Sequence, residues 1–270
     1  MTILIILGAA FSVMVVSLSG VLFTAKHMGD WARERVTYLA TFSAGVLIVL
    51  AYNLIEESLH ESPSTAIVVA AVIAGALFLE IIHHLLPETH HHHEPSAGHT
   101  HTPVDGRRVL ASDAVHNVTD GFLIVPAFLI DWRIGVAATA GILLHELVQE
   151  ISEFFVLKQA GYSDRKALTL NFFSSSTILI GVALALVLAS SELLLSILAG
   201  IAAGGFFSVV LRDLLPHAFE SIKHHGRPII HVIAFIVGSL LMFGVATLAP
   251  HEEFDEETGE ASQTQQVVQI

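Results

Sequence analysis

Long apolar stretches alternate with short polar segments along the whole of this 270-residue chain. A helix needs about 20 apolar residues to cross a bilayer, and stretches of about this length recur throughout the sequence. No basic segment precedes the first stretch and further stretches follow it, so we interpret it as a helix and not as a signal peptide. The pattern predicts an all-α integral membrane protein with eight transmembrane helices, at residues 2–24, 36–55, 65–86, 109–130, 135–157, 166–190, 193–214 and 229–249.

The composition agrees with a membrane protein and narrows its chemistry. Hydrophobic residues make up 53% of the chain and charged residues only 14%, whereas about 25% of the residues in a typical soluble domain are charged. The chain has no cysteine, so disulfides and thiolate ligands are excluded and any metal is held by nitrogen and oxygen. No basic patch supports binding to nucleic acid. The expected partners are the lipid bilayer and divalent metal ions.

Positive charge indicates how the chain is oriented in the membrane. Basic residues follow the first, third, fifth and seventh predicted spans, whereas the other connections hold one, Arg133. Loops rich in Lys and Arg face the cytoplasm, so we expect a multi-pass protein of the cell (inner or plasma) membrane with both termini outside. The basic residues are Lys26, Arg33, Arg35, Arg107, Arg108, Lys158, Arg165, Lys166, Lys223 and Arg227.

Two segments differ from the predicted transmembrane domain at residues 1–249. Residues 87–108 form a His-rich loop, which the orientation places in the cytoplasm. Such tracts bind metal, so we expect the loop to sense or buffer metal, with a plain spacer as the alternative. Residues 250–270 form an acidic extracytoplasmic tail, which we interpret as solvated chain and alternatively as a collector of cations. The loop ligands that we propose are His90, His91, His92 and His93.

Two polar strings interrupt the fourth and fifth apolar stretches. Polar and ionisable side chains are costly inside a bilayer and often mark an ion path. Residues four apart share one helix face, as His116 does with Asp120, and His145 with Gln149. At 1.5 Å per residue, both strings lie near the middle of a hydrocarbon core about 30 Å thick. The strings are His116-Asn117-Val118-Thr119-Asp120-Gly121 and His145-Glu146-Leu147-Val148-Gln149-Glu150.

These strings favour a metal site over simple helix packing. A single buried Asn, Gln or His often joins helices by hydrogen bonds, but seven polar residues at one depth exceed that need. Neighbouring carboxylates repel each other unless a cation or protons offset their charge. Imidazole and carboxylate together suit zinc and its first-row neighbours. The candidate ligands are His116, Asn117, Asp120, His145, Glu146, Gln149 and Glu150.

The two strings resemble signatures of the ZIP (Zrt/Irt-like) family of divalent metal transporters, and we take the bacterial type as the nearest. The first is similar to the HNxxEG or HNxxDG string of the family's fourth helix, and the second to the HExPHE-type string of its fifth. The resemblance implies movement of zinc or a related ion into the cytoplasm. It implies a primary site of His116, Asp120, His145 and Gln149, and an adjacent second site of Asn117, Glu146 and the shared Asp120.

Three further residues complete the expected ion path. Residues 44–62 and 203–221 share a weak internal likeness although their spans run in opposite directions, which favours an inverted repeat in a 3+2+3 arrangement. In that arrangement Glu57 lines the outer mouth, although a plain solvated loop would explain it too. Asp213 and His217 line the inner mouth. The sixth span offers Ser175 but no carboxylate, and a neutral amide at Gln149 binds divalent ions more weakly than His or Glu.

Two other functions remain open at this point. His145-Glu146 begins the HExxH string of a zinc protease, but Gln149 stands where the second His is required. A metal sensor that transports nothing would instead depend on the His-rich loop. We expect no enzyme activity and no organic cofactor. The expected cargo is Zn²⁺, with Fe²⁺, Mn²⁺ and Cd²⁺ as alternatives, and the helix surfaces leave a homodimer open.

Overall fold

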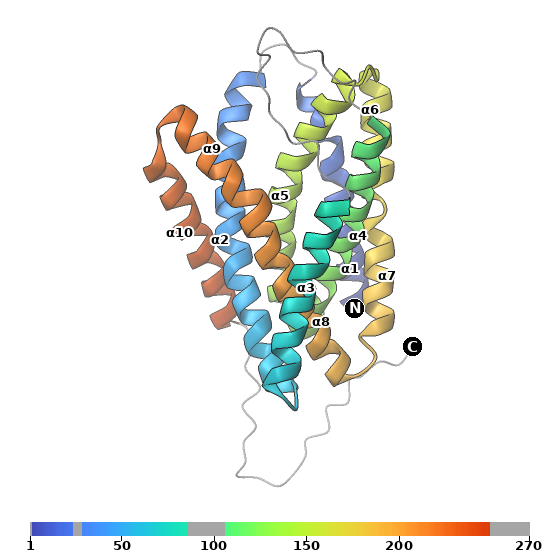
Figure 1. Cartoon of the computed structure of the whole chain (residues 1–270), viewed down its shortest axis with the longest axis vertical. Helices are drawn as coiled ribbons and strands as arrows, with labels where there is room; N and C mark the ends of the chain where they lie inside the picture. The colour runs from blue at the N-terminus through green and yellow to red at the C-terminus, as the bar shows by residue number, and fades with distance from the viewer. Residues whose placement is uncertain (1, 24–28, 86–105, 249–270) are drawn as a thin grey trace.

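The computed structural model is a bundle of long helices that run roughly parallel to its longest axis (Figure 1). It describes residues 2–23, 29–85 and 106–248, and no strand occurs within these ranges. The elements are α1 (Thr2–Val16), the 3-10 helix η1 (Ser17–Phe23), α2 (Gly29–Glu61), α3 (Thr65–Leu85), α4 (Gly106–Ile130), α5 (Trp132–Gln159), α6 (Asp164–Ser175), α7 (Ile178–Leu188), α8 (Glu192–Val209), the π-helix η2 (Val210–Leu214), α9 (Leu215–His225) and α10 (Pro228–Leu248).

Within the described ranges, eight helical segments are long and apolar enough to cross a membrane, which confirms the predicted all-α fold with eight spans. The sixth span joins α6 to α7, and the seventh joins α8, η2 and α9. The seventh continues to His224, beyond its predicted end at residue 214. The predicted 3+2+3 inverted repeat, the outside termini and the division into domain, loop and tail stay predictions.

A π-helical turn explains why the seventh span continues past a proline. Pro216 has no backbone N–H and would break the hydrogen bonding of an α-helix interior. It lies in the first turn of α9, where a missing N–H is tolerated, and η2 directly precedes it. The turn therefore lets one long span continue past Pro216 without a break. Within η2, Arg212 also forms an ion pair with Glu80 of α3, with 2.8 Å between Nη2 and Oε1.

The two central helices carry the predicted polar strings. The most apolar stretches of α4 and α5 are 67% and 72% buried, against 22% for α3 and 17% for α10. Only Asp131 separates α4 from α5, and its carboxylate accepts a hydrogen bond from the backbone N–H of Arg133 at 2.7 Å. This short link makes the two helices antiparallel neighbours.

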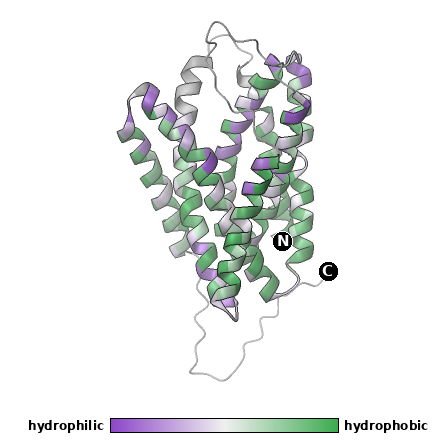
Figure 2. Cartoon of the chain, in the orientation of Figure 1, coloured by the Kyte–Doolittle hydropathy of each residue, from purple (hydrophilic) through white to green (hydrophobic). Residues whose placement is uncertain are grey.

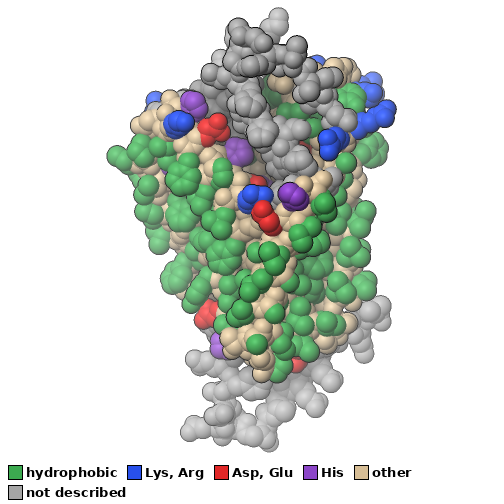
Figure 3. Space-filling view, in the orientation of Figure 1, with side chains coloured by type: hydrophobic (Ala, Val, Ile, Leu, Met, Phe, Trp, Pro, Cys, Tyr) green, Lys and Arg blue, Asp and Glu red, His purple; other side chains and the backbone are tan. Residues whose placement is uncertain are grey.

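Apolar side chains cover the outside of the bundle. Figure 2 shows hydrophobic residues along the outer helices and hydrophilic residues gathered mainly toward the upper end. On the face shown in Figure 3, hydrophobic side chains form a broad band, and most of the visible Lys and Arg side chains lie above it. An apolar band of this kind is what contact with lipid requires.

Three helix pairs pack at unusually short range through reciprocal glycines. A Cβ built on any of these six glycines would lie 1.9–2.2 Å from a carbonyl oxygen of the partner helix. Only glycine permits such an approach, as in many membrane helix pairs. The glycines are Gly45 and Gly238 in the α2–α10 pair, Gly75 and Gly204 in α3–α8, and Gly121 and Gly181 in α4–α7.

Candidate metal centre

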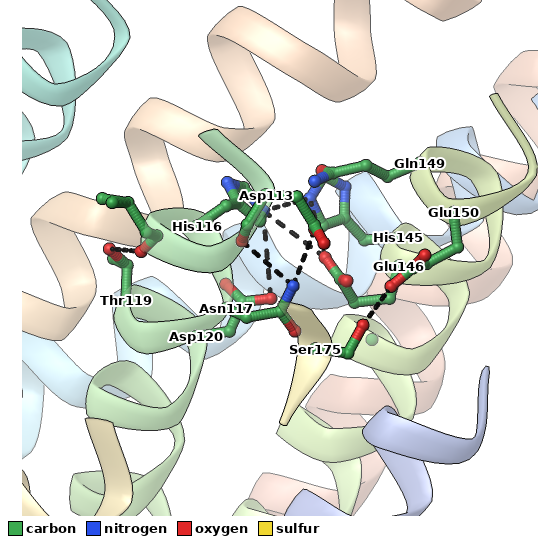
Figure 4. Close-up of polar contacts among 12 residues, drawn as sticks. Asp113, His116, Asn117, Thr119, Asp120, His145, Glu146, Gln149, Glu150 and Ser175 are labelled. Atoms are coloured by element: carbon green, nitrogen blue, oxygen red, sulfur yellow. Dashed lines mark hydrogen bonds and ion pairs between the residues drawn. The ribbon is translucent and has the colours of Figure 1, made fainter. Parts of the chain in front are cut away.

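All seven ligands predicted from the two strings are buried on facing sides of α4 and α5 (Figure 4). None exposes more than 7% of its surface. The i,i+4 spacing places His116 and Asp120 on one face of α4, while α5 contributes His145 and Glu146. The bundle therefore holds ionisable side chains deep in an otherwise apolar interior, where they are costly without a partner.

Three of these residues form a compact group, the His–His–Glu group of His116, His145 and Glu146, with one ligand atom of each within 4.8 Å of the others. The Nε2 atoms of the two histidines are 3.1 Å apart. Oε1 of Glu146 lies 3.4 Å from Nε2 of His116 and 3.8 Å from Nε2 of His145. Asp120 adjoins the group, with Oδ2 3.9 Å from Nε2 of His116.

These separations match what a metal ion requires. In a tetrahedral zinc site with bonds of about 2.0–2.1 Å, neighbouring ligand atoms lie about 3.3 Å apart. The three distances within the His–His–Glu group lie between 3.1 and 3.8 Å. Both carboxylate oxygens of Glu146 are buried without a hydrogen-bond partner among the described residues. The group can therefore accept one cation with small shifts of its side chains.

A second cluster, the acidic group of Asp113, Glu150 and Glu153, lies beside the first, with one carboxylate oxygen of each within 4.8 Å of the others. Asn117 turns toward it, because its amide nitrogen donates to Oδ1 of Asp113 at 2.8 Å. The hydroxyl of Ser175 donates to Oε1 of Glu150. The structure therefore divides the predicted ligands between two clusters.

Two members of the acidic group are absent from the sequence prediction. Asp113 precedes His116 by three residues, and Glu153 follows Glu150 by three, so each lies one turn along the helix from a predicted ligand. The sequence did indicate them, because each is a carboxylate three residues from a predicted ligand. The prediction considered only the two six-residue strings and so omitted both.

Gln149 lies between the two clusters. Its amide nitrogen donates to Oε1 of Glu153 at 3.3 Å. Gln149 also lines a cavity of about 20 Å³ together with His145, Asp213 and His217, which is room for about one water. Nδ1 of His217 donates a hydrogen bond to the backbone carbonyl of Asp213. Two of the residues predicted at the inner mouth thus border the same cavity as His145.

The remaining predicted ligands lie elsewhere. Glu57 is half-buried near the end of α2 and belongs to neither cluster. The loop ligands His90, His91, His92 and His93, like the acidic tail, lie outside the described residues.

Both clusters lie within a region of the chain that matches a model of a known protein family. The family model described as ZIP Zinc transporter matches residues 103–246, more than half of the chain. The chain belongs to the ZIP family. The matched region includes α4 to α9 and most of α10, and with them the whole His–His–Glu group and the whole acidic group. As a family member with eight apolar spans, the chain is a multi-pass membrane protein.

Individual relatives match over part of the chain. IAA-alanine resistance protein 1 of Arabidopsis thaliana is 38% identical over 131 residues, 48% of this chain and 28% of that protein. Zinc transporter ZIP4 of Homo sapiens is 38% identical over 108 residues, 40% of this chain and 17% of its own length. Zinc transporter zipt-7.2 of Caenorhabditis elegans is 29% identical over 142 residues, 51% of this chain and 30% of its own. The matched part of this ZIP chain spans less than a third of each relative.

Proposed function

We propose that this ZIP protein carries divalent metal ions, zinc above all, across the membrane into the cytoplasm. The observation that carries the proposal is the His–His–Glu group. Two imidazole nitrogens and one carboxylate, supplied by adjacent central helices, lie within metal-ligand separations of one another inside an apolar bundle. Relatives whose names describe them as zinc transporters support zinc as the cargo.

The chemistry of the site supports passage of a dehydrated ion. A cation that enters the apolar interior loses its water, and the His116 and His145 nitrogens and the Glu146 carboxylate replace that hydration. The cavity beside His145 extends to Asp213 and His217 on the seventh span, so a second acid and imidazole are available when the ion leaves. Basic residues at the far ends of α5 and α9, such as Lys158 and Lys223, support the cytoplasm as the destination.

Ion selectivity follows from the mixed ligand set. Imidazole nitrogen favours zinc, iron and copper over magnesium and calcium, and carboxylate accepts most divalent ions. We therefore propose Zn²⁺ as the principal cargo, with Fe²⁺, Mn²⁺ and Cd²⁺ as competitors. Competition between these ions in a flux assay measures the order directly.

Zinc flux into liposomes that contain the purified protein tests the proposal. We expect His116→Ala to remove the flux, because it deletes one of the two nitrogen ligands. His224→Ala is the matched control, since His224 is exposed near the end of α9, and it should retain the flux. Deletion of residues 90–101 should also retain most of the flux. Equal flux in wild type and His116→Ala would overturn the proposal, and absence of flux in every form would favour a sensor.

A further inference from the structure

The acidic group has an environment that the His–His–Glu group does not share. Asp113 lies seven residues from the start of α4 at Gly106, and Glu153 lies six residues from the end of α5 at Gln159. At 1.5 Å per residue, both are about 10 Å from a helix end, on the same side of the bundle. Glu146, by the same measure, is about 20 Å from that end. The acidic group is therefore a layer that adjoins the mid-bundle site and extends from it toward this end of the bundle.

The hydrogen bonds to two of the carboxylates come from neutral groups. Asp113 accepts from the Asn117 amide at 2.8 Å, and Glu150 accepts from the Asn171 amide at 2.9 Å and from the Ser175 hydroxyl. Neutral donors satisfy lone pairs but do not offset the charge of Asp113 and Glu150, and uncompensated buried charge is strongly unfavourable. These two carboxylates therefore favour a bound cation or bound protons beside them.

Unused oxygen atoms at the layer favour a cation. Asn171 is completely buried, and while its amide nitrogen contacts Glu150, its carbonyl oxygen Oδ1 has no hydrogen-bond partner within the described part of the chain. The same holds for Oδ2 of Asp113, which is 1% exposed. One proton on a carboxylate donates to only one of these two oxygens, whereas one cation can bind both.

We propose that Asp113, Glu150 and Glu153, with the carbonyl oxygen of Asn171, bind a second divalent cation that is distinct from the transported ion. All four ligand atoms are oxygens, so the site favours hard ions such as Mn²⁺ or Mg²⁺ over zinc, whereas the nitrogen-containing site favours zinc over Mn²⁺. The ion connects three elements, because Asp113 belongs to α4, Glu150 and Glu153 to α5, and Asn171 to α6. It therefore holds α6 against the two central helices.

Mn²⁺ binding to the purified full chain in detergent, with one equivalent of zinc added to occupy the His–His–Glu group, tests this proposal, since the electron paramagnetic resonance signal of free Mn²⁺ falls when the ion binds. We expect Asp113→Asn and Glu153→Gln to weaken Mn²⁺ binding by at least about tenfold, and to leave zinc affinity at the His–His–Glu group within about twofold. Asn171→Ala should weaken Mn²⁺ binding as well and serves where a carboxylate variant does not fold. Asp164→Asn changes an exposed carboxylate that pairs with Lys158 and should leave Mn²⁺ binding unchanged.

Two results would overturn the proposal. Unchanged Mn²⁺ binding in Asp113→Asn, Glu153→Gln and Asn171→Ala would mean that protons neutralise the acidic group. Complete loss of Mn²⁺ binding in His116→Ala would mean that the protein has only the mid-bundle site. Both outcomes are separate from failure of the transport proposal, which depends on zinc flux in His116→Ala and not on Mn²⁺.

Discussion

The Nε2 atoms of His116 and His145 face each other at 3.1 Å. At this separation, one ring donates its Nε2 proton to the other, and either ring can be the donor. A metal ion bound by both Nε2 atoms requires that this proton leave or move to Nδ1. Metal binding at the His–His–Glu group therefore changes the tautomer of one ring, and it releases a proton wherever a ring carries a proton on both nitrogens.

We expect zinc affinity to fall as the pH decreases. Protons and zinc compete for the same imidazole nitrogens, so zinc affinity rises as the pH rises and fewer of these nitrogens are protonated. Between pH 7.5 and 5.5, the affinity should fall by at least about tenfold, as measured by competition with a zinc chelator. His145→Ala should show a shallower dependence, and an affinity in the wild type that is constant over this range would contradict the linkage.

Glu146→Gln isolates the role of charge at the His–His–Glu group. The substitution keeps the size of the side chain and removes the carboxylate charge from a completely buried position. We expect zinc affinity to fall by at least about tenfold, because an amide is a much weaker ligand for a divalent ion. Isothermal titration calorimetry measures it, with Glu192→Gln at the exposed start of α8 as the control. Equal affinities in the two variants would mean that Glu146 does not bind the ion.

At the residue scale, the sequence was sufficient to identify most of the buried polar residues of the site, but not to assign them to the His–His–Glu group or to the acidic group. The i,i+4 spacing of His116 and Asp120, and the position of His145 beside Glu146, were sufficient to predict buried polar residues on these two helices. Which side chains meet depends on how α4 and α5 are rotated about their axes. That rotation is set by packing against other helices, such as the contact of Gly121 with α7. The spacing of residues within one helix gives no information about this packing.

The helix pairs joined by reciprocal glycines should be sensitive to a single methyl group. At Gly204, a Cβ would lie 1.9 Å from the carbonyl oxygen of Val72. We expect Gly204→Ala to destabilise the protein by about 1–3 kcal/mol, because α3 and α8 must separate to accommodate it. Thermal unfolding of the purified protein followed by circular dichroism measures this.

Gly244→Ala is the matched control for this prediction. Gly244 also lies within a helix, α10, but no atom lies within 4 Å of a Cβ built there. Alanine favours the helix by up to about 1 kcal/mol over glycine, so this variant should be as stable as the wild type or more stable. Equal melting temperatures for the two variants would mean that the α3–α8 contact can relax without cost.

At the element scale, the length of apolar stretches was sufficient to predict the number of spans. The details that it missed have local causes. The seventh span continues beyond residue 214 because η2 and the position of Pro216 preserve the helix. The sixth span divides at Ser176 and Thr177 into α6 and α7, and a hydropathy pattern contains no signal for that break.

The predicted orientation of the whole molecule can be tested with single cysteines, because the native chain contains none. Arg165 is exposed at the start of α6, beside other basic residues, and Ser190 is exposed between α7 and α8. Since basic loops face the cytoplasm, a membrane-impermeant thiol reagent should label Ser190→Cys in intact cells. It should label Arg165→Cys only after the membrane is opened. The reverse pattern would place the termini inside and contradict the predicted direction of transport.

The π-helical turn η2 also determines which way two neighbouring side chains point. Asp213 borders the cavity next to His145, whereas Arg212, one residue earlier, reaches outward to Glu80 on α3. Each residue of an α-helix turns the chain by about 100°, so loss of one residue from η2 would rotate all of α9 by about that angle and remove His217 from the cavity. The number of residues in this turn is consequently more restricted than their identity, and a one-residue deletion here would harm the protein more than most substitutions at the same place.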